Sequence, residues 1–399
     1  MNTIDVERFH SPEPVPAEGI RRAAEIMQSG RMFRYLAAQP EDSEVSLLER
    51  DFAKMMGTKY ALAVNSCSSA IMIALRAAGA TIGAKVLVPS FTFTAVPSAI
   101  VNVGAVPVLV EVNSDYRVDL NDLIWKIVQD ANIFLLSHMR GQISDLDAIM
   151  DICDRYGITL IEDAAHGLGA LWAGKPVGSF GKIGCFSFQS AKIVNAGEGG
   201  IFTTNDPEMM AKAVILSGAY EALHKKHFWS EDLEEFFVKW RQLLPLYNMR
   251  MNEYTAAVVR PQLGGIMMKA EIYRAHYSYL TTKLSAEDRV EFPEQYPQEL
   301  RAPDSVQFRV RGFSPTQMRQ FVASVKKAGI PLSAFGADPE NARVPWNWKY
   351  LENTPALPLT RLHLAGACDM RLPSTLTYGH LDYLADAVIA AIREVEATS

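Results

Sequence analysis

Up to Asp163, apolar residues alternate between short runs and helical spacing. Short apolar runs predict strands, and apolar residues three or four positions apart predict helices. The predicted strands cover residues 60–64, 85–88, 105–111, 133–137 and 158–162. The helices predicted before and between them cover residues 44–56, 70–78, 91–103, 120–129 and 146–156. Strands that alternate with helices imply right-handed crossovers and a largely parallel sheet.

Beyond Asp163, glycines separate the apolar runs and the predicted strands become shorter. These strands cover residues 170–173, 184–188 and 200–204. Glycine-rich turns between short strands suggest that antiparallel pieces close the sheet. A helix is predicted at residues 207–220. The stretch 221–247, which is both aromatic and charged, is interpreted as an insertion that extends from the main fold and lies at an interface.

The remaining pattern predicts a connector followed by a second group of elements. Residues 252–284 form a long predicted helix that is interrupted near Pro261. A strand and two helices follow, at residues 306–311, 316–328 and 380–395. Near the amino terminus, a helix at residues 17–29 follows a proline-rich extended arm. We therefore expect an α/β fold with a large domain, residues 1–255, and a smaller α/β C-terminal domain, residues 256–399.

Composition restricts the class of protein. The chain has 399 residues, of which 49% are apolar and 21% charged, and its net charge is −6. This balance is typical of a globular enzyme and does not support a general nucleic-acid role. The cysteines form no CxxC pair, so neither a zinc site nor a disulfide framework is indicated, and Cys153 and Cys185 are expected to be buried. The amino terminus has no apolar signal region and no stretch is long enough to span a bilayer, so we expect a cytoplasmic protein without a membrane partner.

The first candidate for chemistry is the polar turn Asn65–Ser69, between a predicted strand and a helix. Small residues let the backbone approach an anion, and the first helical N–H groups and the helix dipole point at it. The hydroxyls of Ser68 and Ser69 can add hydrogen bonds. The alternative is an ordinary serine N-cap.

The second candidate is Asp163, which ends an apolar strand and is followed closely by His166. A carboxylate in this position is costly unless it is paired, and a protonated pyridine nitrogen is one partner that compensates the cost. His166 then lies beside the ring or contacts its hydroxyl. The alternatives are a helix N-cap for Asp163 and a core histidine for His166.

The third candidate is Lys192, which follows a predicted strand containing Ser187. Ser187 lies between two phenylalanines on the opposite face of that strand and can reach a phosphate. A lysine in apolar surroundings has a lowered pKa and becomes nucleophilic toward an aldehyde. The turn Gly197–Gly200 suggests a tight backbone path beneath a cofactor. The alternative for Lys192 is a solvated surface lysine.

These segments occur in a characteristic order: NSCSSA, PSFTF, SHMRG, EDAAH, GSFGKIGCFSFQSAK, GEGG and NMRMNEYTAA. Over roughly residues 44–265 the chain resembles the DegT/DnrJ/StrS-type sugar aminotransferases of pyridoxal-phosphate (PLP) fold type I. The resemblance implies a mainly parallel central sheet flanked by helices, and pyridoxal 5′-phosphate as the cofactor. It also implies a ping-pong transfer of an amino group from L-glutamate or L-glutamine to a keto or aldehyde sugar, for amino-sugar synthesis in surface polysaccharide or lipopolysaccharide.

The resemblance assigns roles around the cofactor ring. Lys192 resembles the lysine that holds the cofactor as a Schiff base and moves the proton. Asp163 resembles the partner of the pyridine nitrogen. Phe93 matches the aromatic residue that stacks on the ring, and His166 matches a position that holds Gln or His beside it.

The resemblance also assigns roles around the phosphate. Ser187, Ser68 and the backbone of Cys67 match phosphate ligands. Asn248 matches the asparagine that a second subunit donates to the phosphate. That last position implies a homodimer with shared active sites.

The segment His138–Gly141 departs from the family, which usually has an apolar or aromatic residue at the position of Arg140. An arginine can clamp a carboxylate bidentately, so Arg140 and the neighbouring His138 are candidate substrate-binding residues for an acidic sugar such as a keto-octulosonate. Similar HMRG segments occur in transaminases that make 8-amino-3,8-dideoxy-octulosonate. The alternative is a structural arginine in a strand-end loop.

Three other functions remain open. A close variant is the amination of a cyclitol or the formation of an aminobenzoate precursor. A PLP-dependent sugar dehydratase replaces the lysine with histidine, so Lys192 argues against it. A non-catalytic cofactor-binding regulator is the third, although no DNA-binding helix-turn-helix is appended to the pattern.

Overall fold

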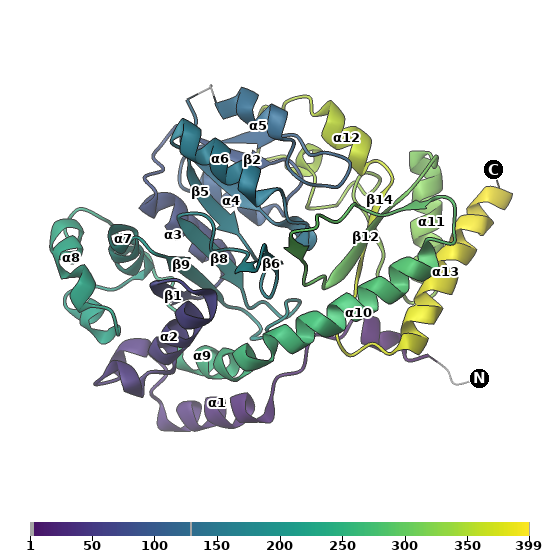
Figure 1. Cartoon of the computed structure of the whole chain (residues 1–399). Coiled ribbons are helices and arrows are strands. Elements are labelled where there is room, and N and C mark those ends of the chain that lie inside the picture. Colours follow the sequence, from purple (N-terminus) through teal and green to yellow (C-terminus); the bar gives the residue numbers. More distant parts are fainter. Residues whose placement is uncertain (1–3, 128–129, 399) are drawn as a thin grey trace.

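A seven-stranded sheet forms the centre of the larger part of the molecule (Figure 1). The computed structural model of the chain describes residues 4–127 and 130–398, and within them the strand order of this sheet is β1-β9-β8-β5-β4-β2-β3. Its strands are β1 (Tyr60–Val64), β2 (Lys85–Pro89), β3 (Val106–Val110), β4 (Ile133–Ser137), β5 (Thr159–Asp163), β8 (Ile183–Ser187) and β9 (Gly200–Thr204). Neighbours from β8 to β3 pair in parallel, and β9 is antiparallel to both β8 and β1. The predicted, largely parallel sheet is confirmed.

Helices cover both faces of this sheet, which explains why β1, β4, β8 and β9 are buried along their whole length. One face packs against α2 (Glu44–Met56), α5 (Leu120–Ile127) and α6 (Leu146–Tyr156). The other face packs against α3 (Cys67–Ala77), α4 (Ala95–Asn102) and α7 (Pro207–Ser217). The last two residues of the helix predicted at 120–129 lie outside the described residues.

Two of these helices begin at other residues than predicted, one for a local reason and one because of tertiary packing. Helix α3 begins at Cys67 rather than at residue 70, because the Ser66 hydroxyl accepts a hydrogen bond from the Ser69 N–H at 3.1 Å and caps the helix. Helix α4 begins at Ala95 rather than at residue 91. Phe91 instead packs edge-on against Phe335 from the C-terminal half of the chain.

The long helix predicted after Asn252 is present and is interrupted at its proline. It consists of α9 (Glu253–Val259), a 3-10 helix η7 (Arg260–Gly265) and α10 (Ile266–Leu284). Pro261 lacks the N–H that an uninterrupted α-helix needs at this point. Figure 1 shows α10 running from α9 to the C-terminal elements, where it packs beside α13, and its role as the connector to a second domain stays a prediction.

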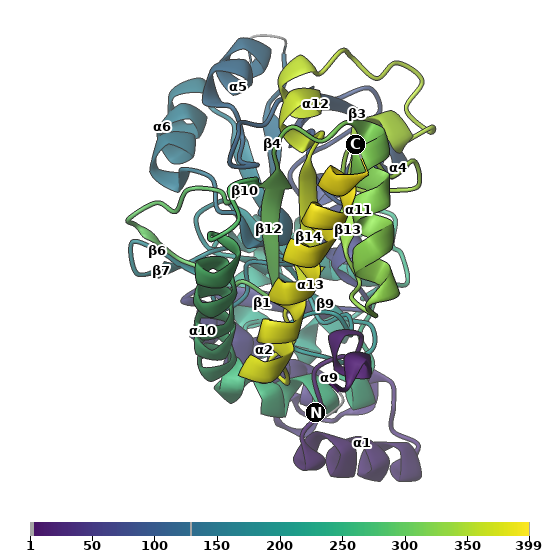
Figure 2. The same ribbon diagram turned by 90° about the vertical axis from the view of Figure 1, so that its right-hand side faces the viewer.

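The C-terminal elements form a second sheet, which is antiparallel and flanked by helices (Figure 2). Its order is β10-β12-β14-β13 within the described part of the chain. The elements are β10 (Val290–Glu291), β12 (Ser305–Val310), α11 (Pro315–Lys327), β13 (Ser333–Ala334), α12 (Pro358–Leu364), β14 (Ala367–Arg371) and α13 (Tyr378–Ala397). This sheet has its own apolar core with α10, α11 and α13. The predicted division between residues 255 and 256 falls inside α9, and the exact domain boundary stays a prediction.

A small antiparallel sheet joins the two halves of the sequence. It has the order β11-β6-β7, with β6 (Leu171–Trp172), β7 (Lys175–Pro176) and β11 (Glu299–Leu300). The antiparallel pieces expected after Asp163 are therefore β6, β7 and β9. The strand predicted at residues 184–188 is β8, which continues the parallel sheet instead.

The remaining segments lie around the edges of the molecule. The stretch 221–247 contains α8 (Glu234–Trp240), which packs near α7 at the end of the molecule opposite α13 (Figure 1). Helix α1 (Ala17–Ser29) packs against α9. Cys153 and Cys185 are buried, as predicted, and all four cysteines are free. Within the described residues, no helix has the length and apolar character needed to cross a membrane.

Candidate active site

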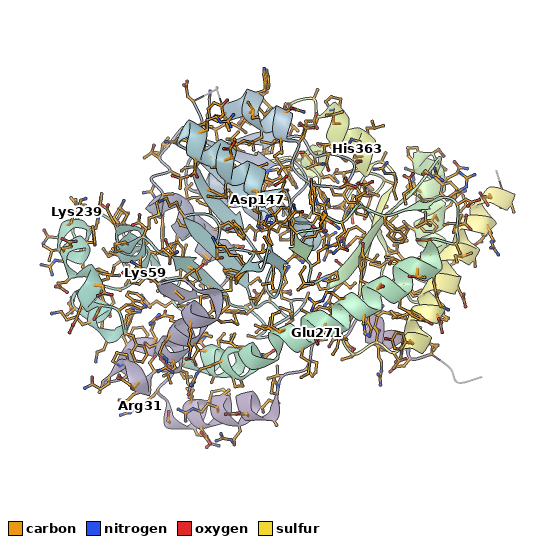
Figure 3. All side chains as sticks on the ribbon, viewed as in Figure 1. Arg31, Lys59, Asp147, Lys239, Glu271 and His363 are labelled. Atoms are coloured by element: carbon orange, nitrogen blue, oxygen red, sulfur yellow. The ribbon has the colours of Figure 1, made fainter. Side chains whose placement is uncertain are left out.

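The predicted site residues gather at the carboxyl-terminal edge of the main sheet. Register places Ser137 opposite Asp163 on neighbouring strands. It also places Ser187 opposite Gly200, which in turn lies opposite Val64 at the end of β1. The turns that follow these strand ends therefore meet, as expected for a ligand site of an open α/β sheet. Figure 3 draws side chains throughout the region between the main sheet and the C-terminal elements, and its labels Glu271 and His363 mark the positions of α10 and α12.

Asp163 is a buried carboxylate held by neutral donors. The Ser137 hydroxyl donates to one of its oxygens at 2.9 Å, and the Ala165 N–H donates to the other at 3.1 Å. The Cys67 thiol lies 3.9 Å from the second oxygen, and burial, followed by the charge of Asp163, raises the pKa of that thiol well above its usual value. None of the described Lys or Arg side chains forms an ion pair with Asp163. The carboxylate is thus oriented and without a cationic partner, which suits a protonated ring nitrogen.

Lys192 lies at one end of a chain of three polar side chains. Its Nζ is 2.7 Å from Nε2 of His166, and Nδ1 of the same imidazole is 3.3 Å from a carboxylate oxygen of Asp304. Burial, opposed by the charge of Asp304 and assisted by that of Arg140, lowers the pKa of Lys192 to about 8. Burial and the charge of Lys192 lower the pKa of His166 to about 4. At neutral pH His166 is therefore neutral, and Lys192 exchanges its proton more readily than a surface lysine.

The turn before α3 forms a cradle for an anion. The Ser69 hydroxyl donates to Asn65 at 2.6 Å and the Ser66 hydroxyl caps the helix, so the Cys67 and Ser68 N–H groups are the helical donors without an internal acceptor. A Cβ atom on Gly200 would lie 2.4 Å from the Cys67 nitrogen, so only glycine allows β9 to approach this turn. Ser68 is exposed and thus open to a ligand. Both the N-cap interpretation and the anion interpretation of this turn fit its geometry.

Ser187, Phe93 and Asn248 lie around this cradle. The Ser187 hydroxyl accepts a hydrogen bond from the Gln189 N–H at 3.3 Å and lies across Gly200 from the turn. Phe93 follows the end of β2, and 47% of its surface is exposed. Asn248 is exposed, and the next residue along the chain accepts a hydrogen bond from the Asn65 N–H at 2.9 Å. That Asn248 reaches the cofactor phosphate in the active site of a second subunit stays a prediction.

The structure separates His138 from Arg140. The His138 side chain is fully buried and bonds to Glu162 at 3.0 Å. Because side chains alternate along β5, Glu162 and Asp163 point to opposite sides, so His138 lies away from the Lys192 group. Arg140 has a φ of 56°, in the left-handed region that is uncommon for residues other than glycine. Its guanidinium forms an ion pair of 2.6 Å with Asp369, close enough to Lys192 to influence its pKa.

Three residues near the site carried no sequence signal. Asp304 precedes β12, Asp369 lies on β14 and Arg343 lies in the loop between β13 and α12. Each comes from the C-terminal elements, far along the chain from Lys192. An acidic residue at a strand end or an arginine in a loop is too common to identify by pattern.

Comparison with known proteins agrees with this geometry. A profile of the DegT/DnrJ/EryC1/StrS aminotransferase family matches residues 17–389. The chain belongs to this family. The aminotransferase is 32% identical over 300 residues to 3-amino-5-hydroxybenzoate synthase of Amycolatopsis mediterranei, covering 73% of each chain. It is 31% identical to GDP-perosamine synthase of Vibrio cholerae over 62% of its own length and 66% of that enzyme's.

A solved structure shows that the fold is shared. It is the PLP-form of a Streptococcus pneumoniae protein named as a sugar aminotransferase, with 20% identity and a TM-score of 0.81 over 96% of this chain and 98% of that one. The predicted fold class is confirmed. Pyridoxal 5′-phosphate is the cofactor of this aminotransferase family.

The residues present fit this cofactor. The unpaired carboxylate of Asp163 matches a protonated pyridine nitrogen, and the free N–H groups at the start of α3 match a phosphate. The Lys192 amine belongs to the same cluster of side chains, because Asp163 and Cys67 both raise its pKa. The Ser187 hydroxyl adds a donor beside the cradle.

Proposed function

We propose that this aminotransferase moves an amino group from L-glutamate or L-glutamine to a keto or aldehyde sugar for surface polysaccharide or lipopolysaccharide. The buried amine of Lys192, in contact with neutral His166 and close to Asp163, carries the proposal. The position of Arg140 beside Lys192 supports an acidic acceptor, with 8-amino-3,8-dideoxy-octulosonate as the product. In this proposal the enzyme is a cytoplasmic homodimer with shared active sites, and the four free cysteines suit a reducing compartment.

Each group of the chain has a defined task in this reaction. Bound pyridoxal phosphate supplies the carbonyl that takes up the amino group and a ring that withdraws electrons. Asp163 stabilises the positive ring nitrogen. Lys192 takes a proton from the substrate carbon and returns it, and its lowered pKa makes both directions accessible near neutral pH. His166 and Asp304 position the Lys192 amine.

A second candidate reaction is the amination of a cyclitol ketone or of an aminobenzoate precursor. The relative from Amycolatopsis mediterranei favours it, because its name describes an aromatic amino acid as product. This candidate uses the same residues and differs only in the acceptor. A dehydratase is disfavoured by Lys192, and a non-catalytic regulator by the complete set of groups around that lysine.

The test is to mix the purified holoenzyme with L-glutamate and, separately, with L-glutamine. We expect the visible absorption band of the bound cofactor to convert to that of its pyridoxamine form. That form is then offered a keto sugar acid and a cyclitol ketone, and the band should return with the sugar. Lys192→Ala should retain the cofactor without a borohydride-stable link and lose turnover by several orders of magnitude.

Lys182→Ala is the matched control, because Lys182 is an exposed lysine just before the same strand. It should leave the conversion unchanged. A cofactor band that neither donor alters would refute the proposed function. A borohydride-stable adduct in Lys192→Ala would refute the assignment of the lysine.

A further inference from the structure

The loop between β13 and α12 is anchored to the turn that carries Phe93. The Ala342 carbonyl accepts hydrogen bonds from the Thr94 N–H and from the Trp348 indole, both at 2.9 Å. The Tyr350 hydroxyl lies 2.9 Å from the Thr94 hydroxyl. Because Thr94 directly follows Phe93, these contacts fix a C-terminal segment beside the position expected to stack on the cofactor ring.

Arg343 is the next residue of this anchored loop. Its guanidinium is half-buried and lies 6.0 Å from the centre of the Phe335 ring. Within the described residues it forms neither an ion pair nor a side-chain hydrogen bond. Burial and the nearby charge of Arg140 lower its pKa to about 10, against the opposing charges of Asp369 and Asp338. Arg343 is therefore a charged group at neutral pH that has no bonded counterion.

In the described part of the chain, the guanidiniums of both Arg343 and Arg140 keep N–H groups without an acceptor. Arg140 forms its ion pair with one oxygen of Asp369, and the other oxygen of that carboxylate accepts a hydrogen bond from Gln307 at 2.8 Å. The Nε of Arg140 is buried and lacks an acceptor in the described part of the chain. The charges of Asp369 and Asp338 act on Arg343, but within the described residues neither carboxylate forms an ion pair with it. The carboxylate of a bound substrate would accept hydrogen bonds from these donors.

We propose that Arg343, with Arg140, forms a subsite for the carboxylate of an acidic sugar, and that Arg343 sets the preference for an acid over a neutral sugar. This inference rests on the proposed function and deepens it by naming Arg343 as a second residue that recognises the acid group. The amino donor also carries carboxylates, so the same chemistry has a second source. We assign the subsite to the sugar, because the loop that carries Arg343 is anchored to the Phe93 turn at the mouth of the site.

The test measures binding rather than turnover. The holoenzyme is titrated calorimetrically with D-glucuronate and with its methyl ester, which lacks the negative charge and carries one additional methyl group. The wild type should bind the acid more tightly than the ester. Arg343→Gln should lower the affinity for the acid roughly tenfold or more and leave that for the ester unchanged. Arg361→Gln is the matched control, because Arg361 is exposed and stacks on Trp346 in the same region.

Each alternative result has a defined meaning. Equal binding of acid and ester by the wild type, or an unchanged preference in Arg343→Gln, overturns the proposal. If Arg343→Gln instead weakens only the conversion by L-glutamate, the subsite serves the donor and the assignment to the sugar is wrong. Arg343→Lys keeps the charge and should recover part of the affinity if Arg343→Gln folds poorly. Failure of the proposed function gives a different result, since glutamate would then leave the cofactor band of the wild type unchanged.

Discussion

Lys192 lies among charges of both signs, and this balance sets the fraction of reactive amine. Burial lowers its pKa most, Asp304 raises it and Arg140 lowers it. The same burial would raise the pKa of Asp304, but His166, Lys192 and Arg140 together hold that pKa below its ordinary value. The carboxylate therefore stays ionised next to an amine that is partly neutral at physiological pH.

This balance predicts opposite shifts for two variants. Cofactor-free protein should capture pyridoxal phosphate at Lys192 with a midpoint near pH 8, measured as borohydride-stable product against pH. Asp304→Asn removes a charge that stabilises the ammonium, so the midpoint should fall. Arg140→Gln removes a charge that destabilises it, so the midpoint should rise. Asp386→Asn, an exposed carboxylate on α13, is the control, and shifts of the same sign in both site variants would contradict the electrostatic account.

The part of the site that is local along the chain could be predicted from the sequence. Asp163 with His166, and Ser187 with Lys192, each occur within a few residues of each other after a strand, so their spacing carries the signal. Asp304 lies 138 residues from its partner His166, and nothing in the pattern around it announces the contact. His138 shows the converse limit, because adjacency to Arg140 in sequence did not bring it to the same place.

At the scale of elements, the closest approach in the site is that of β9 to the start of α3. Gly200 has no side chain, and an added Cβ would lie within 2.4 Å of the Cys67 nitrogen. Because both atoms belong to backbones, the turn itself has to move. Such a movement would misdirect the N–H groups that the cofactor phosphate requires.

We therefore predict that Gly200→Ala destabilises the protein by about 1–3 kcal/mol and selectively weakens phosphate binding. The measurement compares the affinity for pyridoxal phosphate with that for pyridoxal, in parallel with chemical unfolding. The loss should be larger for the phosphorylated compound. Gly264→Ala is the control, because no atom lies within 4 Å of its added Cβ. Equal losses for both compounds would show that the turn does not act on the phosphate.

The elements themselves were largely predictable because their ends are set locally. The helix at residues 44–56 ends at Gly57, which adopts a φ of 67°, and its start is capped by Ser43. The prediction failed where tertiary packing decides. An apolar run continues from Phe91 into α4, but Phe91 leaves the helix to contact Phe335, which the local pattern cannot reveal.

At the scale of the whole molecule, a buried charge cluster ties the N-terminal region to the 221–247 stretch. Glu49 on α2 accepts two hydrogen bonds from Arg34, at 2.6 and 3.0 Å, and lies 2.9 Å from the His227 ring. Burial alone would raise the pKa of Glu49, but Arg34 and His227 lower it to about 2. Burial and Arg34 lower the pKa of His227 to about 4, against the opposing effect of Glu49.

This cluster makes stability depend on pH in a defined direction. In the unfolded chain His227 binds a proton below its ordinary value of 6.5, whereas in the folded protein it stays neutral down to about 4. The unfolded state therefore holds more protons in this window, and stability falls as the pH drops from 6.5 toward 4, by up to about 1.4 kcal/mol per pH unit for one such group. Glu49 extends the loss below its ordinary value of 4.5.

The histidine variant separates this effect from general acid unfolding. His227→Gln should lower the melting temperature near neutral pH, because Glu49 loses a bonded partner, yet it should show a shallower decline in melting temperature between about pH 6.5 and 5 than the wild type. His10→Gln, at an exposed position, serves as the control and should retain the wild-type slope. If His227→Gln declines as steeply as the wild type, the acid sensitivity arises elsewhere.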